Sequence, residues 1–453
     1  MERGRMDNRN ITIPQDVLWI LRKLNTAGYE AYVVGGCVRD SLLGREPHDW
    51  DITTNAQPLE VKALFKRTID TGLQHGTVTV MNHGVGYEVT TYRLDGDYSD
   101  HRRPEAVSFT SDLKEDLLRR DFTINAMAYH PEEGLKDFFD GVKDLTEGVI
   151  RAVGDPDARF NEDALRIMRA VRFAAQLGFS IDPATREAAK NHVEDLKYVS
   201  MERIETELTK LICSPHPEEM EELYKLGITR VVLPEFDRMM ETPQNTPYHF
   251  TDVGHHTIVV MQHVSSTKVM RYAALLHDIA KPLCKTTDDT GQDHFFNHPV
   301  KGAPLAEEIL RRLKMDNRTI QDVCQLVLWH DFGITGEMTP ARFRKGMSKM
   351  GIEYFPRYME IRRADMEGQS SFEREQKEAQ LVRMEELYRD VREKENALSV
   401  KDLKIRGNDL MAAGIPAGPR MGELLKALLE EVLEDPAKNQ PEYLLQRAKK
   451  LSE

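Results

Sequence analysis

Two aspartates, Asp49 and Asp51, stand one residue apart in the run HDWDITT and offer the clearest chemistry in this chain of 453 residues. If residues 49–53 form a strand, both carboxylates leave the same face while Trp50 points to the other. Two carboxylates on one face can share Mg²⁺. In-line attack on a phosphate needs metal ions because charge develops on both the attacking and the leaving oxygen. The pair therefore predicts the catalytic magnesium site of a nucleotidyl-transfer reaction.

A third carboxylate and a phosphate-binding turn are expected beside this pair. Glu88 lies in the alternating run YEVTTYR at 87–93, which predicts a neighbouring strand. Residues 29–34 have the β-branched and aromatic composition of a strand, and Gly35 and Gly36 interrupt it before a short helix. The two glycines let a triphosphate approach the backbone, and the start of a helix favours its negative charge.

Charged residues recur every three positions in the run EDALRIMRAVRF at 162–173. On one continuous helix, Asp163 and Arg166 project from the same side. An accepting carboxylate beside a donating guanidinium matches the edges of cytosine and adenine and opposes those of uracil and guanine. The run is therefore either an element that selects CTP and ATP without a template, or a solvated helix face with intrahelical ion pairs.

Five motifs follow one another in the first part of the chain. They are GGCVRD at 35–40, HDWDITT at 48–54, RRDFTINAMAY at 119–129, DFFDG at 137–141 and NEDALRIMRAVRF at 161–173. In this order they resemble the motifs of class II tRNA nucleotidyltransferases, the CCA-adding enzymes, which share a polymerase β-like head with bacterial poly(A) polymerases. The resemblance covers about the first 235 residues and returns in the C-terminal run GNDLMAAGIPAGPRMGELLKALL.

The resemblance implies template-independent addition of CCA to the 3′ end of tRNA from CTP and ATP, with release of pyrophosphate. Asp49, Asp51 and Glu88 are then catalytic, and Asp121 and Asn125 brace the site. Arginine suits the triphosphate because its fork donates to two oxygens at once. The implied nucleotide-binding residues are Gly35, Gly36, Arg39, Arg120, Asp163, Arg166, Arg169 and Arg172.

Full CCA addition has an alternative within the same superfamily: an enzyme that adds only the terminal A, with a separate CC-adding partner. The stretch DYSDHRRPEAVSFTSDL, which contains Asp100, His101, Arg102 and Arg103, resembles the flexible loop that full CCA-adding enzymes use when they change from C to A. The resemblance therefore favours the full reaction.

The elements that must position these residues predict an α+β protein. A polymerase β-like head with a mixed sheet and helices is followed by all-α domains, because the chain after GDPDARF is almost wholly of helical composition. The expected divisions are the head at 1–150, a neck with the base-recognition helix at 151–205, a helical body at 206–245, an HD domain at 246–345, a charged helical linker at 346–400 and a tail at 401–453 that binds the tRNA elbow.

A second constellation starts at His256 and continues with His277 and Asp278 in ALLHDIAKP and with Asp331 in VLWHDFG. Its order resembles the HD metal-dependent phosphohydrolases. Mixed nitrogen and oxygen ligands suit a transition metal or Mg²⁺, and His298 and His330 are candidates for further ligands. The associated hypothesis is a secondary cyclic phosphodiesterase or phosphatase activity, and its alternative is a degenerate domain kept for structure.

Composition limits the class of protein. Hydrophobic residues make up 40% of the chain, which is ample for several cores, and no run approaches the 18 or more apolar residues of a membrane span. A cytoplasmic protein without a membrane partner is expected. The net charge of −13 means that contacts with the tRNA acceptor arm and elbow depend on local arginines.

Two interpretations from other classes stay open on the sequence. One is an HD phosphohydrolase whose head only binds RNA, and the other is a non-enzymatic RNA chaperone. The oligomeric state is open as well.

Overall fold

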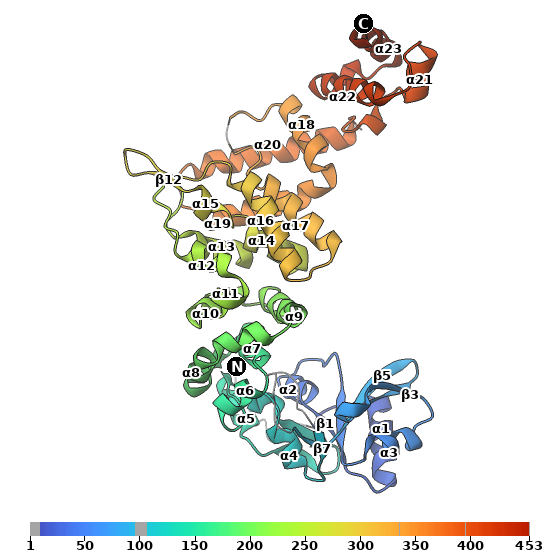
Figure 1. Cartoon of the computed structure of the whole chain (residues 1–453), viewed down its shortest axis with the longest axis vertical. Coiled ribbons are helices and arrows are strands. Elements are labelled where there is room, and N and C mark those ends of the chain that lie inside the picture. The colour runs from blue at the N-terminus through green and yellow to red at the C-terminus, as the bar shows by residue number, and fades with distance from the viewer. Residues whose placement is uncertain (1–9, 96–106, 335, 395, 453) are drawn as a thin grey trace. The chain divides into compact units, whose positions relative to one another are not determined.

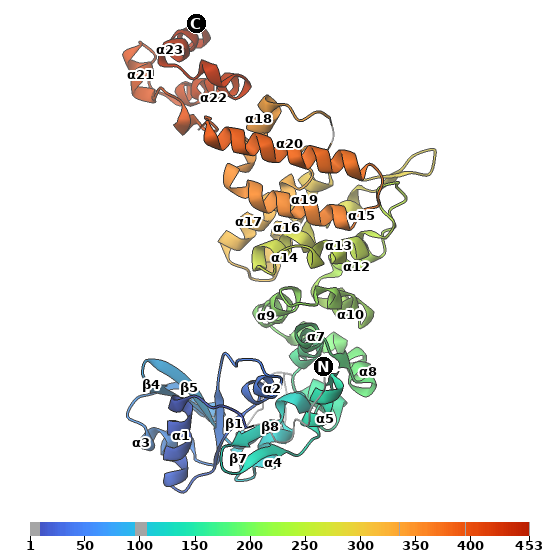
Figure 2. The same ribbon diagram turned by 180° about the vertical axis from the view of Figure 1, so that it is seen from behind.

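The computed structural model describes residues 10–95, 107–334, 336–394 and 396–452, and it divides into two compact units. Unit 1 contains residues 1–237 and 312–314, and unit 2 contains residues 238–311 and 315–453. The predicted loop with Asp100, His101, Arg102 and Arg103 lies outside the described residues. Strands gather in the first part of unit 1, and the rest of the chain is almost entirely helical (Figures 1 and 2). The predicted α+β class is confirmed.

Seven short strands of unit 1 form one mixed sheet in the order β3-β4-β5-β2-β1-β8-β9. β1 runs antiparallel to β2 and β8, whereas β2 and β5 are parallel. Small strands β6 and β7 pair separately. The bounds are β1 Ala31–Val34, β2 Asp51–Thr54, β3 Thr68–Gly72, β4 Thr77–Asn82, β5 Val85–Thr91, β6 Arg93–Asp95, β7 Val107–Phe109, β8 Met127–His130 and β9 Gly134–Asp137.

The sheet owes its core to amphipathic helices that pack against it. Helix α1 buries Val17, Ile20, Leu21 and Leu24 at helical spacing and contacts β1. These residues share one apolar cluster with strand residues of the sheet. The helices of this part are α1 Gln15–Thr26, α2 Gly36–Leu42, α3 Pro58–Leu64, α4 Leu113–Leu118 and α5 Gly141–Glu147.

The remainder of unit 1 is helical, and one expected helix is interrupted. Residues 162–173 are not one helix, because α6 ends at Glu162 and α7 begins at Leu165. Asp163 between them has an extended backbone, and its carboxylate accepts a hydrogen bond from the Leu165 N–H. Aspartate favours such helix ends because it bonds to nearby backbone amides. The elements are β10 Val149–Ile150, α6 Pro156–Glu162, α7 Leu165–Leu177, β11 Ser180–Ile181, α8 Pro183–Asn191, α9 Met201–Ile212, α10 Met220–Lys225, α11 Ile228–Val232 and α12 Pro234–Met240.

Unit 2 is built on a helical core in which α13 packs on α14 and α19, and α14 packs on α17. The prediction of a charged linker at 346–400 is wrong. Helix α19 buries most of its side chains, and α20 buries Leu381, Met384, Leu387 and Val391 along one stripe and contacts α18. The elements are α13 Val253–Gln262, α14 Lys268–Leu276, α15 Lys281–Cys284, β12 Thr286–Thr287, β13 Asp293–His294, α16 His298–Arg312, α17 Asn317–Trp329, α18 Pro340–Met350, α19 Phe355–Glu367 and α20 Arg374–Glu393.

The C-terminal part of unit 2 has an apolar cluster of its own around Leu410, Leu428 and Leu444. It is formed mainly by α21 Gly407–Ala412, α22 Pro419–Glu434 and α23 Pro441–Ser452. The turn between α21 and α22 uses Gly414 at a φ of +93°, as the glycine-rich run predicts. No described helix combines the length and the apolar composition needed to cross a bilayer.

Candidate active site and metal cluster

The register of the sheet places Asp51 and Glu88 side by side. Ile52 pairs with Val89 in the parallel ladder of β2 and β5, so the residue before each is its partner's neighbour on the same face. Asp49, Asp51 and Glu88 line one open cleft of about 920 Å³, and Trp50 packs against the core. The expected alternation is therefore present, although β2 begins at Asp51 rather than at residue 49.

The three carboxylates disfavour one another's ionisation. Burial raises the pKa of Asp51, with a further increase from Asp49 and opposition from Arg120. Burial also raises the pKa of Glu88, and Asp51 and Asp49 add to that shift. A divalent cation among these oxygens removes the conflict. The residues therefore fit Mg²⁺, which prefers carboxylate ligands and, when bound, neutralises charge on phosphate oxygens.

A glycine turn lies next to these carboxylates. Val34, the last residue of β1, pairs with Asp51 on one side and with Ala128 on the other. Gly35 follows with a φ of +81°, and its N–H donates to the Met127 carbonyl at 3.1 Å. A Cβ at Gly35 would lie 3.0 Å from Nη1 of Arg120. The turn therefore has room for backbone only, and it joins the carboxylate cleft to an arginine.

A chain of hydrogen bonds braces the arginines of the site. Nη1 of Arg39 donates to Oδ1 of Asn125 at 2.6 Å, and Nδ2 of Asn125 donates to Oδ1 of Asp121 at 3.1 Å. Arg169 donates from Nε and Nη2 to Oδ2 of Asp121 at 2.9 and 2.6 Å. Burial alone would raise the pKa of Asp121, but Arg169 and Asn125 outweigh it and lower the pKa. Asp121 and Asn125 thus occupy the bracing positions that the resemblance implies.

Arg172 lies in the interior rather than in the cleft. Its side chain is almost completely buried, and Nε donates to Oε2 of Glu207 on α9 at 2.8 Å. The guanidinium carbon lies 3.5 Å from the centre of the Phe173 ring. Nη1 of Arg169 also approaches Oε1 of Glu207 at 3.6 Å. Arg172 and Glu207 therefore fix α7 against α9.

The predicted base-reading residues both have protein partners. Oδ2 of Asp163 accepts from Nη2 of Arg203 at 2.7 Å. Arg166 donates to Oε2 of Glu162 at 2.6 Å and to the Arg119 carbonyl at 2.8 Å. Arg203, on α9, is a residue that the sequence analysis missed, because only the packing of α9 on α7 brings it to Asp163.

Unit 2 brings together His256, His277 and Asp278, whose ligand atoms lie within 4.8 Å of one another. All three side chains are buried. The proposed fourth member, Asp331, lies elsewhere: its Oδ2 is 3.3 Å from Nε2 of His298. The carboxylate beside His256 is that of Asp365, whose Oδ1 is 3.0 Å from Nε2.

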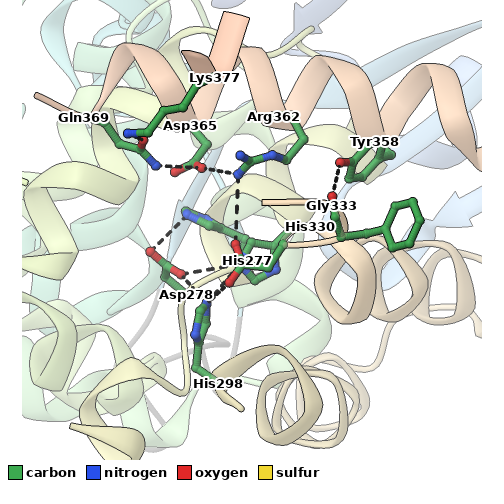
Figure 3. Close-up of polar contacts among 12 residues, drawn as sticks. His277, Asp278, His298, His330, Gly333, Tyr358, Arg362, Asp365, Gln369 and Lys377 are labelled. Carbon is green, nitrogen blue, oxygen red and sulfur yellow. Dashed lines mark hydrogen bonds and ion pairs between the residues drawn. The ribbon is translucent and has the colours of Figure 1, made fainter. Parts of the chain in front are cut away.

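Asp278 is shared by a second group, formed with His298 and His330, whose ligand atoms also lie within 4.8 Å of one another. Figure 3 shows Asp278 between the rings of His277 and His298, with Asp365 and Arg362 above them on α19. Sequence analysis missed Asp365 because it assigned the run IRRADMEG to a linker. The donor set of imidazoles and carboxylates fits a divalent transition metal.

Three family descriptions match parts of the chain. "Poly A polymerase head domain" matches residues 31–151, "Probable RNA and SrmB- binding site of polymerase A" matches residues 178–240, and "tRNA nucleotidyltransferase domain 2 putative" matches residues 300–448. The first of these contains the carboxylate cleft and the glycine turn described above.

Solved structures resemble the whole chain. The CCA-adding enzyme of Bacillus stearothermophilus, solved in complex with CTP, has a TM-score of 0.71 and 27% identity, and covers 97% of this chain and 99% of that one. The Thermotoga maritima CCA-adding enzyme, solved with tRNA, has a TM-score of 0.59 at 22% identity, covers 98% of this chain and 99% of that one, and supports the fold alone.

Curated relatives share sequence at two levels. The CCA-adding enzyme of Levilactobacillus brevis is 54% identical over 200 residues, which are 44% of this chain and 50% of that protein. The matched region therefore spans about half the length of that relative. The CCA-adding enzyme of Ligilactobacillus salivarius is 36% identical over 443 residues, which are 96% of each protein. The chain belongs to the family of CCA-adding enzymes.

Proposed function

We propose that this protein adds CCA to the 3′ ends of tRNA from CTP and ATP by Mg²⁺-dependent nucleotidyl transfer. The observation that supports this most strongly is the gathering of Asp49, Asp51 and Glu88 in one cleft beside the Gly35 turn. Relatives solved with CTP and with tRNA have the same fold, and we assign the same ligands to this chain. The cytoplasm, where tRNA matures, is the expected compartment.

Each group has a role in this proposal. The 3′ hydroxyl of the RNA attacks the α-phosphate of the nucleotide, a new phosphodiester bond forms, and the bond to pyrophosphate breaks. Asp49, Asp51 and Glu88 hold Mg²⁺, which when bound supplies positive charge at the attacking and leaving oxygens. The triphosphate contacts are Gly35, Gly36, Arg39 and Arg120. Asp163 and Arg166 contact the base, and Arg169 and Arg172 position α7.

Removing the Asp163 carboxylate should relax nucleotide choice. We expect Asp163→Ala to lower the discrimination of CTP and ATP against UTP and GTP by about 1–3 kcal/mol, or roughly tenfold or more in the ratio of kcat/KM. Arg203→Met should act in the same direction without contacting the base, because Arg203 holds Oδ2 of Asp163 at 2.7 Å. Steady-state kinetics with all four nucleotides tests this. An equal loss for all four would mean that Asp163 does not read the base.

The Gly35 turn offers a matched pair of glycine variants. Both Gly35 and Gly28 have a φ near +90°, so alanine at either position costs about 1–3 kcal/mol of backbone strain. Only at Gly35 does the added Cβ meet Arg120, at 3.0 Å, whereas at Gly28 it meets nothing within 4 Å. We expect Gly35→Ala to lose roughly 100-fold in kcat/KM and Gly28→Ala to keep its activity. Equal activities would remove Arg120 from the site.

We also propose that the His/Asp cluster of unit 2 binds a divalent metal and hydrolyses phosphate esters at RNA 3′ ends. Besides the buried donors, two cations face the cluster: Nζ of Lys281 lies 2.7 Å from Asp278, and Nη1 of Arg362 lies 3.9 Å from Asp331. The test is hydrolysis of 2′,3′-cyclic AMP and of a 3′-phosphorylated RNA after chelation and reloading with Mn²⁺, Co²⁺, Ni²⁺ or Mg²⁺. No turnover with any of these ions contradicts this activity and leaves CCA addition untouched.

A further inference from the structure

Four histidines from four separate helical segments meet around Asp278. His256 lies in α13, His277 follows α14, His298 begins α16 and His330 follows α17. All four rings are buried, and Figure 3 shows His277, His298 and His330 directed toward the space beside Asp278. Such a concentration of buried titratable groups needs a physical explanation.

The hydrogen bonds of the rings fix which nitrogen faces inward. Each Nδ1 lies near a backbone carbonyl, at 3.0 Å for His256, 2.7 Å for His277, 2.8 Å for His298 and 2.7 Å for His330. A carbonyl can only accept, so each Nδ1 carries the hydrogen, and Nε2 of each neutral ring has a free lone pair. Metal-binding histidines are commonly oriented in this way, by a carbonyl bonded to the nitrogen remote from the metal.

The inward-facing nitrogens divide into two pairs about the Asp278 carboxylate. Oδ2 lies 3.2 Å from Nε2 of His277 and 3.7 Å from Nε2 of His256. Oδ1 lies 3.1 Å from Nε2 of His298 and 3.6 Å from Nε2 of His330. Each oxygen of one carboxylate therefore faces its own pair of imidazoles.

A further carboxylate accompanies each pair. Oδ1 of Asp365 lies 3.0 Å from Nε2 of His256, and Oδ2 of Asp331 lies 3.3 Å from Nε2 of His298. Oδ1 of Asp331 lies 3.5 Å from Nε2 of His330. The two halves of the cluster thus have the same composition: two histidines, one carboxylate of their own and one shared oxygen of Asp278.

The lone pairs need positive charge between them. Nε2 of His298 and Nε2 of His330 are 3.1 Å apart, and without a hydrogen on either atom they repel. Nε2 of His256 and of His277 are buried and make no hydrogen bond to any described residue. A buried acceptor without a partner costs about 1–3 kcal/mol, so each pair is built for a cation.

We infer that the cluster is a dinuclear metal centre in which Asp278 bridges two divalent transition-metal ions. His256, His277 and Asp365 hold one ion, and His298, His330 and Asp331 hold the other. This inference rests on the proposed metal-binding function of the cluster and adds the second ion and the bridge. Imidazole-rich ligand sets favour Mn²⁺, Fe²⁺, Co²⁺ or Ni²⁺ over Ca²⁺.

The surroundings of the centre favour an anionic ligand. Lys281 and Arg362 lie 2.7 Å from Asp278 and 2.6 Å from Asp365. The three carboxylates and these two cations leave one net negative charge, which two divalent ions turn into a positive one. Asp331 is 33% exposed, whereas Asp278 and Asp365 are buried. Solvent and a phosphate group therefore reach the ion beside Asp331 first.

The test counts metal ions in the full chain. Asp49→Ala and Asp51→Ala remove the ligands of the proposed head site, so that bound metal reports unit 2. After chelation, equilibrium dialysis against Mn²⁺ followed by elemental analysis should give two ions per chain. Low-temperature electron paramagnetic resonance should show an exchange-coupled Mn²⁺ pair, because a bridging carboxylate couples the two spins.

Variants then separate the two ions. His298→Gln should leave one ion and an uncoupled Mn²⁺ spectrum, and Asp278→Asn should weaken both ions. His263→Gln is the matched control, because His263 also donates from Nδ1 to a carbonyl but is exposed on the last turn of α13. It should keep two coupled ions.

The outcomes distinguish the inference from the function on which it rests. One uncoupled ion in the parent protein, unchanged by His298→Gln, overturns the dinuclear centre and leaves a single metal site in place. No bound ion overturns both. If a variant fails to fold, the stoichiometry and the spectrum of the parent protein still decide between one ion and two.

Discussion

Replacement of Asp51 by alanine should reduce nucleotide incorporation by roughly 1,000-fold or more, which corresponds to about 4 kcal/mol of lost transition-state stabilisation. Asp51 lies at the start of β2, between Val34 of β1 and Glu88 of β5, and it is the carboxylate with a neighbour on each side. Without it, Asp49 and Glu88 cannot together hold Mg²⁺ against the triphosphate. Single-turnover incorporation of ATP into a transcript ending in CC measures the loss.

The matched control for Asp51→Ala is Glu46→Ala. Glu46 lines the same cleft, but it does not contribute to the shifted pKa values of Asp51 and Glu88. Its replacement removes one negative charge from the cleft and no proposed metal ligand, so activity should stay within a few-fold of the parent. If Asp51→Ala and Glu46→Ala behaved alike, the carboxylates would act through general electrostatics and not as metal ligands.

The second large effect concerns stability. Asp121→Asn should lower the free energy of unfolding of unit 1 by about 3–5 kcal/mol at pH 7, because it leaves the Arg169 guanidinium without its charged partner. Asp121 is only 9% exposed, and two nitrogens of Arg169 bond to its Oδ2. Chemical denaturation followed by tryptophan fluorescence tests this. A Trp329→Phe background leaves Trp19 and Trp50, which both lie in unit 1.

The pH dependence of that difference has a defined sign. The pKa of Asp121 is lowered in the folded protein, so its contribution is fully present above the ordinary aspartate pKa of about 3.9. The contribution is lost as pH falls from there through the folded pKa. The gap between parent and Asp121→Asn should thus be constant from pH 7 to about 5 and close in stronger acid. A gap that widened in acid would show that Asp121 is not ionised in the folded state.

Local patterns in the sequence were enough to predict the carboxylate cleft. Alternation along a strand places Asp49 and Asp51 on one side of Trp50, and a glycine pair before a helix marks the neighbouring turn. Pairing of β2 with β5 then brings in Glu88, as expected for an adjacent strand. The break at Asp163 was not expected, because the charge periodicity continues across it while the backbone does not.

Contacts that depend on tertiary packing were beyond reach. Asp365 lies in a run of charged residues that resembles a solvated helix, yet α19 is buried because Arg362 and Asp365 neutralise each other at 2.6 Å. Asp331 follows a histidine in the sequence, which favoured its assignment to the first group of ligands. Only the packing of α13 on α14 and α19 decides which carboxylate faces His256. Arg203 was missed for the same reason.

The most direct test of the central claim uses tRNA transcripts that end at the discriminator base, after C, and after CC. The purified protein with Mg²⁺, CTP and ATP should extend all three to the same CCA end, read at single-nucleotide resolution. Extension of the CC-ended transcript alone, by one A, would contradict full CCA addition and identify an A-adding enzyme that works with a CC-adding partner. No extension of any transcript would contradict the nucleotidyl-transfer function itself.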